Sequence, residues 1–254
     1  DKAEKLLRLM GVKEEKAIRN LLGYEDNTAG RIMTSEFVSL PATATVGDAI
    51  EAIRELDEDF ESVYYVYTED PSGMLTGVLS LRTLIVADRD ATLGQLAYRD
   101  LVYVSPDEDQ EDVTDEMTKY DLVAIPVCDE NRHILGIVTF DDAMDVIEEE
   151  TTEDFEKMAA MLPSDKPYLK SGIFATWKAR LPWLMILMLS ATFTGMILNH
   201  YESALAACLV LNSYIPMLSG TGGNSGTQAS VAVIRALSLD EVDFSDILRV
   251  LWKE

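Results

Sequence analysis

The sequence predicts an α+β region built from two copies of one strand–helix unit, then a strongly acidic helix, then two helices that span a membrane. Three observations predict this order. Two stretches before Asp141 resemble one another. Nine carboxylates then follow with no basic residue between them, and an uncharged apolar run of 18 residues begins at Leu181. A run of that length is a candidate for a transmembrane helix.

Acidic and apolar residues separate along the chain. Of 254 residues, 45 are acidic and 21 basic, which gives a formal charge of −24, yet 48% are hydrophobic. The acid lies almost wholly before Pro163, whereas the apolar block begins at Leu181. This charge argues against nucleic acid as a partner, because phosphates require Lys and Arg. It favours divalent cations, which acidic surfaces attract.

Cysteine and histidine are too few for other kinds of site. Cys128 and Cys208 are far apart and predict no disulfide framework. With His133 and His200 as the two histidines, a zinc site of nitrogen and sulfur ligands is not expected.

The first element is expected to be a helix over residues 1–22, whose apolar residues recur at helical spacing. It is charged and amphipathic, unlike a signal peptide. We interpret residues 1–30 as the remnant of a helical domain on the cytosolic side.

Two similar units are predicted over residues 31–90 and 91–141. Each has a short strand, a proline, an acidic helix, two strands joined by a turn, and another helix; Pro41 matches Pro106, and GVLS from Gly77 matches GIVT from Gly136. Such duplication indicates one structural unit that occurs twice. The unit resembles the tandem CBS pair, a regulatory module.

The acidic connecting segment is predicted over residues 142–180. Asp145, Glu149 and Glu153 are four residues apart, so their carboxylates form a stripe on the helix. Like charges at this spacing destabilise a helix by roughly 0.2–0.5 kcal/mol per pair. Oxygen ligands without His or Cys select Mg²⁺, Ca²⁺ or Mn²⁺, and Mg²⁺ often uses one or two carboxylates. The alternative is a solvated acidic face.

The membrane region is predicted over residues 181–254, with spans at about 181–199 and 203–237 and a cytosolic tail. The basic residues Lys166, Lys170, Lys178 and Arg180 precede the first span, which predicts that the preceding part is cytosolic. The alternative for the first span is a buried helix of a soluble core.

The uncharged string LSGTGGNSGTQ over residues 218–228 is the most unusual part of the second span. Its glycines predict broken or non-helical backbone, which membranes tolerate where protein buries it or water lines it. It is not a P-loop, since no Gly-Lys-Ser/Thr follows. We consider pore lining and small-residue helix packing as alternatives. The pore-lining candidates are Gly222, Gly223, Asn224, Ser225 and Gln228.

A nucleotide site is a weaker prediction. CBS units can hold a ribose at Ser/Thr-x-x-Asp, and Thr139 with Asp142 meets this pattern. In the first unit, Ser80 is followed by Thr83 instead of Asp.

The order of these parts resembles the MgtE family of bacterial magnesium channels, through YEDNTAGRIMT, DQED, YDL, TFDDAMDVIEEETTED and GTGGNSGTQ. The resemblance implies a homodimeric, multi-pass protein of the bacterial cell membrane that passes Mg²⁺ down its gradient. Mg²⁺ is then both cargo and regulator, and the acidic helix acts as a plug. The resemblance implies these sensor carboxylates: Glu111, Asp121, Asp142, Asp145, Glu150, Glu153 and Asp154.

Three departures from the family matter. Its members have five membrane helices, and the pore carboxylate lies in the last, beyond the second span at which this sequence stops. Most of the N-terminal helical domain is absent. Thr83 stands where ATP-binding relatives have Asp, so ATP is a doubtful ligand.

We therefore predict a Mg²⁺-gated magnesium channel subunit and not an enzyme, since no nucleophile–base arrangement stands out. The alternative is a nucleotide-sensing CBS module on a membrane anchor, without transport.

Overall fold

The computed structural model describes residues 11–56, 60, 63–164, 168–239 and 241–254. It divides into two compact units, Asp1–Glu148 and Glu149–Glu254, which are treated separately. The helix predicted over residues 1–22 falls partly outside the described residues. Within them, α2 (Val12–Leu21) confirms its second half.

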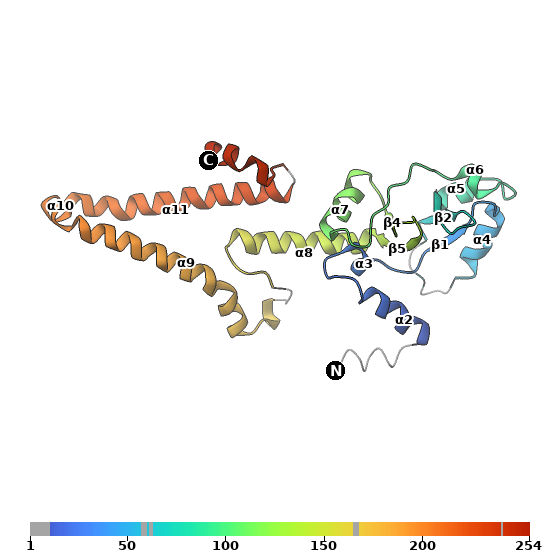
Figure 1. Ribbon diagram of the computed structural model, residues 1–254, viewed down its shortest axis with the longest axis horizontal. Coiled ribbons are helices and arrows are strands. Elements are labelled where there is room, and N and C mark those ends of the chain that lie inside the picture. Colours follow the sequence, from blue (N-terminus) through green and yellow to red (C-terminus); the bar gives the residue numbers. More distant parts are fainter. Residues whose placement is uncertain (1–10, 57–59, 61–62, 165–167, 240) are drawn as a thin grey trace. The chain divides into compact units, whose positions relative to one another are not determined.

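The first repeat is a three-stranded sheet with helices around it (Figure 1). Strand β1 pairs in parallel with β2, and β2 pairs antiparallel with β3. A capping box starts α4: Thr45 and Asp48 each accept a hydrogen bond from the other's backbone N–H. The elements are α3 (Ala29–Ile32), β1 (Val38–Pro41), α4 (Val46–Arg54), β2 (Tyr65–Glu69), β3 (Leu75–Ser80), α5 (Leu81–Val86) and α6 (Leu93–Leu96).

The second repeat keeps the same order with a shorter first strand. Its antiparallel pair is β4 with β5. The counterpart of β1 is reduced to one parallel bridge, in which the Cys128 N–H donates to the Val104 carbonyl at 2.9 Å. The duplication predicted from the sequence is thus present in the fold. The elements are α7 (Gln110–Lys119), β4 (Ala124–Cys128), β5 (Ile134–Thr139) and α8 (Phe140–Met158).

Three apolar clusters form the core of this unit. One is centred on Val66 and Leu79 of the first repeat and another on Ile125 and Val138 of the second. The third draws on both repeats, with Tyr67 and Leu75 from one and Ala124, Cys128 and Ile137 from the other. The two sheets therefore share a core.

The glycine common to both repeats lets a linker approach the last strand. At Gly77 of β3, an added Cβ would lie 2.6 Å from the Ala97 Cβ and 3.2 Å from the Tyr98 carbonyl oxygen. At Gly136 of β5, it would lie 2.6 Å from the Thr34 carbonyl oxygen. In both repeats the approaching linker forms a β-bridge with the residue after the glycine.

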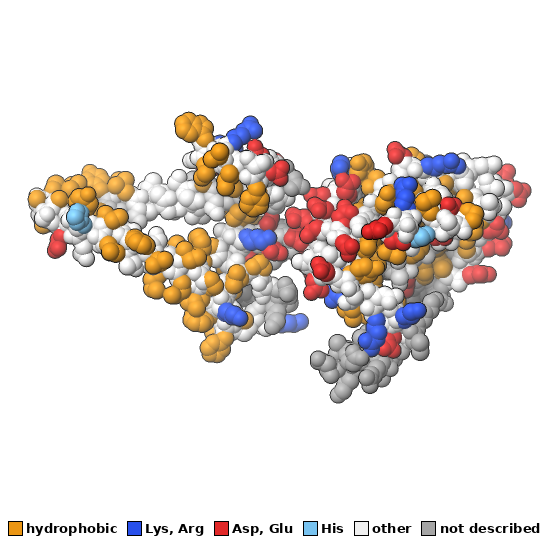
Figure 2. Space-filling view, viewed as in Figure 1, with side chains coloured by type: hydrophobic (Ala, Val, Ile, Leu, Met, Phe, Trp, Pro, Cys, Tyr) orange, Lys and Arg blue, Asp and Glu red, His pale blue; other side chains and the backbone are white. Residues whose placement is uncertain are grey.

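Helix α8 begins directly after β5. Its buried residues Ala143 and Val146 anchor one side of its first half. Apart from these, the helix is largely solvent-accessible, and Figure 2 shows acidic side chains gathered over it.

The second unit contains the apolar helices. Helix α9 (Ile173–His200) contains Pro182, and α11 (Leu209–Ser238) contains Pro216. The short α10 (Glu202–Ala207) contacts both, so the chain turns at Tyr201 and Cys208. Because α9 begins at Ile173, Lys178 and Arg180 lie on this helix and not in a linker. Helices η1 (Tyr168–Lys170), η2 (Phe244–Asp246) and α12 (Ile247–Lys253) complete the unit.

The break predicted in the glycine-rich string is wrong, because α11 runs through residues 218–228 as one α-helix. Glycine lowers helix propensity by about 1 kcal/mol per residue, and this cost does not end the helix here. The Thr221 and Thr227 hydroxyls also donate within the helix, to the carbonyls of Met217 at 2.9 Å and Gly223 at 3.1 Å.

By length and composition, one helix among the described residues is apolar enough to cross a membrane, α9. Its side chains lie outside any protein interior, with Leu184 and Ile186 each 56% exposed. Helix α11 does not meet the same hydropathy criterion, since its glycines and polar residues dilute its apolar content.

We expect Gly136→Ala to destabilise the protein by about 1–3 kcal/mol, because the new methyl group would overlap the Thr34 carbonyl. Gly47→Ala is the matched control. It lies in α4 with its nearest neighbour at 3.4 Å, and we expect it to be neutral or to stabilise by up to about 1 kcal/mol. Chemical denaturation in detergent measures both. Equal effects of the two changes would contradict the close approach.

Candidate functional site

The carboxylates of α8 differ in how the helix dipole acts on them. Asp141 and Asp142 lie in the first turn, where the helix dipole favours negative charge. The others, including Glu150, Glu153 and Asp154, lie further along the helix, beyond the reach of this favourable effect, and Glu156 lies in the last turn, where the dipole disfavours it. Nine carboxylates precede the first base, Lys157. The far half of α8 therefore carries the larger electrostatic cost.

Lys157 already neutralises one predicted sensor residue. Its Nζ lies 2.7 Å from Glu153 Oε1. The hydrogen bond to Glu153 raises the pKa of Lys157, with Asp154 and Glu150 adding to the effect. A cation binding at Glu153 would have to compete with this ammonium group.

Asp142 accepts a hydrogen bond from Thr139, the other residue of the Ser/Thr-x-x-Asp pattern. The Thr139 hydroxyl, which is buried, donates to Asp142 Oδ2 at 2.7 Å. Asp145, one turn further along, is exposed. The Thr139–Asp142 pair predicted from the sequence thus exists, and its hydrogen bond leaves the other carboxylate oxygen of Asp142 available for a cation or a ribose hydroxyl.

The two sensor candidates outside α8 lie at the two ends of α7. Asp109 caps this helix by accepting from the Glu111 N–H at 2.9 Å, so Glu111 lies in the first turn. Asp121 follows the last turn with a φ of 53°, and the next N–H, of Leu122, donates back to the Met117 carbonyl at 2.9 Å. This is a left-handed helix end, a position that favours Gly, Asn or Asp. Asp121 therefore has a structural role as well as a charge.

Among the described residues, no group of three or more His, Cys, Asp or Glu side chains converges on one point. The seven sensor candidates are instead distributed along α8 and at both ends of α7. Such a surface suits Mg²⁺ held by one or two carboxylates with its remaining waters.

The buried hydroxyl of Tyr67 was not singled out by the sequence analysis. This oxygen has no hydrogen-bond partner, and burial raises the pKa of Tyr67. Beside it is a cavity of about 10 Å³, lined by residues that include Phe37, Tyr64 and Tyr65. That volume holds about one water molecule. The alternation of tyrosines in VYYVY was the available signal, because it predicts a tyrosine on the inner face of β2.

The glycine-rich string separates into two faces once it is helical. At 100° per residue, Gly220, Gly222, Gly223 and Gly226 fall on one side of α11. The pore-lining candidates Asn224, Ser225 and Gln228 fall on the other side, together with Thr221. Gly222 and Gly223, also predicted to line a pore, belong to the glycine side. An added Cβ at any of the four glycines would meet nothing within 4 Å.

Two repeats that share a core and each end in a capped helix define a tandem CBS pair. The CBS domain model matches residues 29–90 and 93–149. A second model, described as a divalent cation transporter and named MgtE, matches residues 215–254. Magnesium transporter MgtE of Thermus thermophilus is 41% identical over 251 residues, which are 99% of this chain and 56% of the relative. The chain belongs to the MgtE family.

Solved structures agree with this assignment. The soluble part of a magnesium transporter matches with a TM-score of 0.56 and 44% identity, over 59% of each chain. The cytosolic domain of the Mg²⁺ channel MgtE in complex with ATP matches with a TM-score of 0.54 and 39% identity, over 56% of this chain and 58% of that one. The chain spans about half the length of the curated relatives it matches.

We expect Lys157→Gln to tighten Mg²⁺ binding, because it frees the Glu153 carboxylate. An exposed ion pair contributes about 0.2–1 kcal/mol, so the gain in affinity is up to about fivefold. Calorimetric titration of the chain in detergent measures it. Lys119→Gln is the control, because Lys119 makes the same 2.7 Å pair with Glu116, which is not a sensor candidate. Equal tightening in both variants would show that net charge alone matters.

Proposed function

We propose that this chain is part of a magnesium channel of the bacterial cell membrane, opened and closed by cytosolic Mg²⁺. The observation that carries the proposal is the continuous acidic helix α8, which leads from the CBS pair towards the apolar helix α9. Membership of a family of magnesium transporters supports Mg²⁺ as the cargo.

The domain organisation proposed here keeps the boundaries predicted from the sequence. Residues 1–30 are the remnant of a helical domain, and 31–90 and 91–141 are the two CBS units. Residues 142–180 connect them to a membrane region over 181–254. In this topology α9 and α11 both cross the membrane, and the CBS pair is cytosolic. Exposed apolar side chains on α9 and the basic residues before them support it.

Gating is proposed to follow from repulsion along α8. At low Mg²⁺ the unscreened carboxylates repel each other and the acidic surfaces near them, which favours an open state. At high Mg²⁺, ions held at Glu111, Asp121 and the α8 carboxylates cancel this repulsion and favour the closed state. Several weak sites that act on one two-state element shift it strongly, although each binds modestly.

We further propose that two copies associate through matching helices of the repeats. Leu81 and Ile85 form an apolar stripe on α5, and both are exposed. Phe140 and Met144 occupy the same places on α8, with Ile147 continuing the stripe, and these are exposed too. An apolar face repeated on both units supports a homodimer.

The two faces of α11 allow both interpretations of its sequence. The glycine face permits close approach of another helix. The face with Asn224, Ser225 and Gln228 offers neutral oxygen ligands, which suit a hydrated cation. We propose that this polar face lines part of the ion path.

A nucleotide-sensing module without transport is the alternative. The Thr139–Asp142 pair supports nucleotide binding, and so does the ATP complex of a family member, although that member is itself a Mg²⁺ channel. Against it, Thr83 replaces the acid in the first repeat, where its hydroxyl lies 2.9 Å from that of Ser80. This alternative predicts indifference to Mg²⁺, so the Mg²⁺ arm of the calorimetry separates the two functions, whereas ATP binding alone does not.

We expect the combined change of Asp142, Asp145 and Glu153 to Ala to uncouple the channel from internal Mg²⁺. The change removes both the repulsion that favours the open state and the sites that bind Mg²⁺. Measured as flux by the full-length protein in liposomes, the ratio of flux at low to flux at high internal Mg²⁺ should therefore fall at least about tenfold, which corresponds to 1.4 kcal/mol of lost differential binding.

The matched control for this variant removes the same charge elsewhere. Asp90, Asp100 and Glu130 are exposed and lie outside the sensor set. Changing these three to Ala should leave closure unaltered. Unchanged closure in the sensor variant would refute the gating mechanism.

A further inference from the structure

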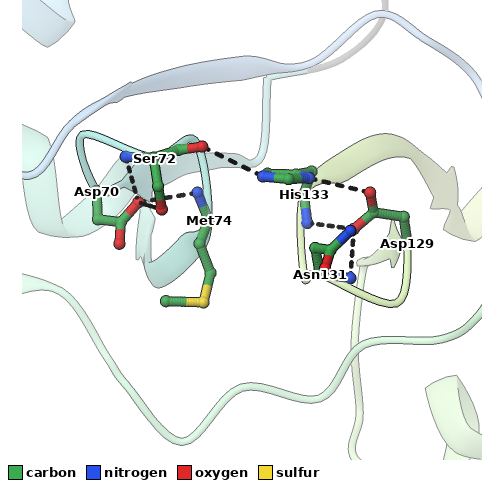
Figure 3. A network of polar contacts seen from close by, with 6 residues as sticks. All are labelled: Asp70, Ser72, Met74, Asp129, Asn131 and His133. Carbon is green, nitrogen blue, oxygen red and sulfur yellow. Dashed lines mark hydrogen bonds and ion pairs between the residues drawn. The ribbon is translucent and has the colours of Figure 1, made fainter.

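The hairpin turns of the two repeats are built in the same way (Figure 3). In the first, Asp70 Oδ1 accepts from the N–H groups of Ser72 at 2.8 Å and Met74 at 3.0 Å. In the second, Asp129 Oδ1 accepts from those of Asn131 at 2.9 Å and His133 at 2.8 Å. Met74 and His133 are therefore equivalent positions, and the duplication places a histidine in one repeat only.

These equivalent turns meet each other across the CBS pair. Met74 and His133 form an antiparallel bridge, and the Leu75 N–H donates to the Arg132 carbonyl at 2.9 Å. The histidine ring adds a side-chain link to this bridge. Its Nε2 lies 3.2 Å from the Ser72 carbonyl oxygen, and its Nδ1 lies 2.9 Å from Asp129 Oδ2.

Both partners of the ring are acceptors. A backbone carbonyl oxygen only accepts, and so does an ionised carboxylate. Both contacts are hydrogen bonds at once only if both ring nitrogens carry a proton, which is the imidazolium form. In either neutral tautomer, one nitrogen would direct a lone pair at an oxygen.

We propose that His133 is a proton-dependent clasp that joins the two CBS units when it is charged and loosens when it loses its proton. The partner it requires is the first repeat's turn, at Ser72. The clasp uses none of the carboxylates proposed to bind Mg²⁺, so it provides a separate, pH-dependent control of how firmly the repeats are held together.

The charges around the ring favour the charged form. The hydrogen bond that the ring donates to Asp129 raises the pKa of His133 above its ordinary 6.5, and the charge of Asp70 adds to this. The same bond lowers the pKa of Asp129 below its ordinary 3.8. Arg132 is engaged with the Tyr103 ring, 4.8 Å away. Burial raises the pKa of Cys128 to about 12, so that this thiol stays neutral.

The sign of the pH dependence follows from these directions. A raised histidine pKa contributes stability that is complete below 6.5 and disappears as pH rises through the folded-state value. The lowered carboxylate pKa contributes stability above 3.8 that disappears as pH falls through its folded-state value. The clasp should therefore be firmest between pH 3.8 and 6.5 and loosen as pH rises through the folded-state pKa of His133.

The first test is a side-chain NMR titration of the whole 254-residue chain in detergent micelles with labelled histidine. The chain has two histidines, so His200→Gln assigns both signals. We expect His133 to titrate above 6.5 in the wild type and at a lower pH in Asp129→Asn, whose amide still accepts from the turn and donates to a neutral ring. An ordinary His133 pKa, unchanged in Asp129→Asn, would overturn the proposal.

The second test follows hydrogen exchange at the Leu75 amide, which bonds across the two turns. His133→Gln keeps a donor for Ser72 and carries no charge. Relative to this variant, the wild type should exchange more slowly at a pH below the His133 titration measured in the first test and equally at a pH above it; comparison at the same pH cancels the intrinsic rate. The same ratio at both pH values would overturn the clasp. If His133→Gln fails to fold, Asp129→Asn serves in its place, with the same expected ratios.

Discussion

Repulsion between like charges along α8 is the constraint on which the rest of the molecule depends. Nine carboxylates lie on one helix, and seven of them lie beyond the first turn, where the helix dipole no longer favours them. A helix under this load persists only if packing or counterions offset the cost. Its first half has packing, through Ala143 and Val146. In its second half Lys157 offsets part of the cost, and we propose that cations from solution offset the rest.

The CBS pair provides the rigid support for that helix. Its two sheets share a core. The glycine in the last strand of each repeat lets a linker pack against that strand, and separating the two would break backbone hydrogen bonds. The turns that meet at Met74 and His133 add a contact whose strength depends on protonation. Cation binding at the carboxylates and proton binding at His133 would thus act on the same module from separate sites.

The sequence predicted the repeats and the acidic helix because these features are local patterns. The conformation of the glycine-rich string was harder to predict, because composition does not show whether hydrogen bonding within a helix outweighs the low helix propensity of glycine. In α11 it does. The sequence predicted a short first strand in the second repeat, but the structure has a single bridge there, at Val104. Whether such a segment forms a strand depends on its pairing with a distant neighbour, which a local pattern does not show. Tyr67 and the clasp were also missed. His133 and Ser72 are 61 residues apart, and a histidine between turn residues carries no signal of its distant partner.

The most direct test of the account is hydrogen exchange along residues 141–158 with and without Mg²⁺, in the chain held in detergent. The account predicts that millimolar Mg²⁺ slows exchange in the second half of α8, from Glu149 onward, much more than in the half fixed by Ala143 and Val146. Monovalent salt at equal ionic strength should have a much smaller effect. Exchange that does not respond to Mg²⁺, or that responds equally to monovalent salt, would contradict the claim that bound divalent cations relieve the repulsion on this helix.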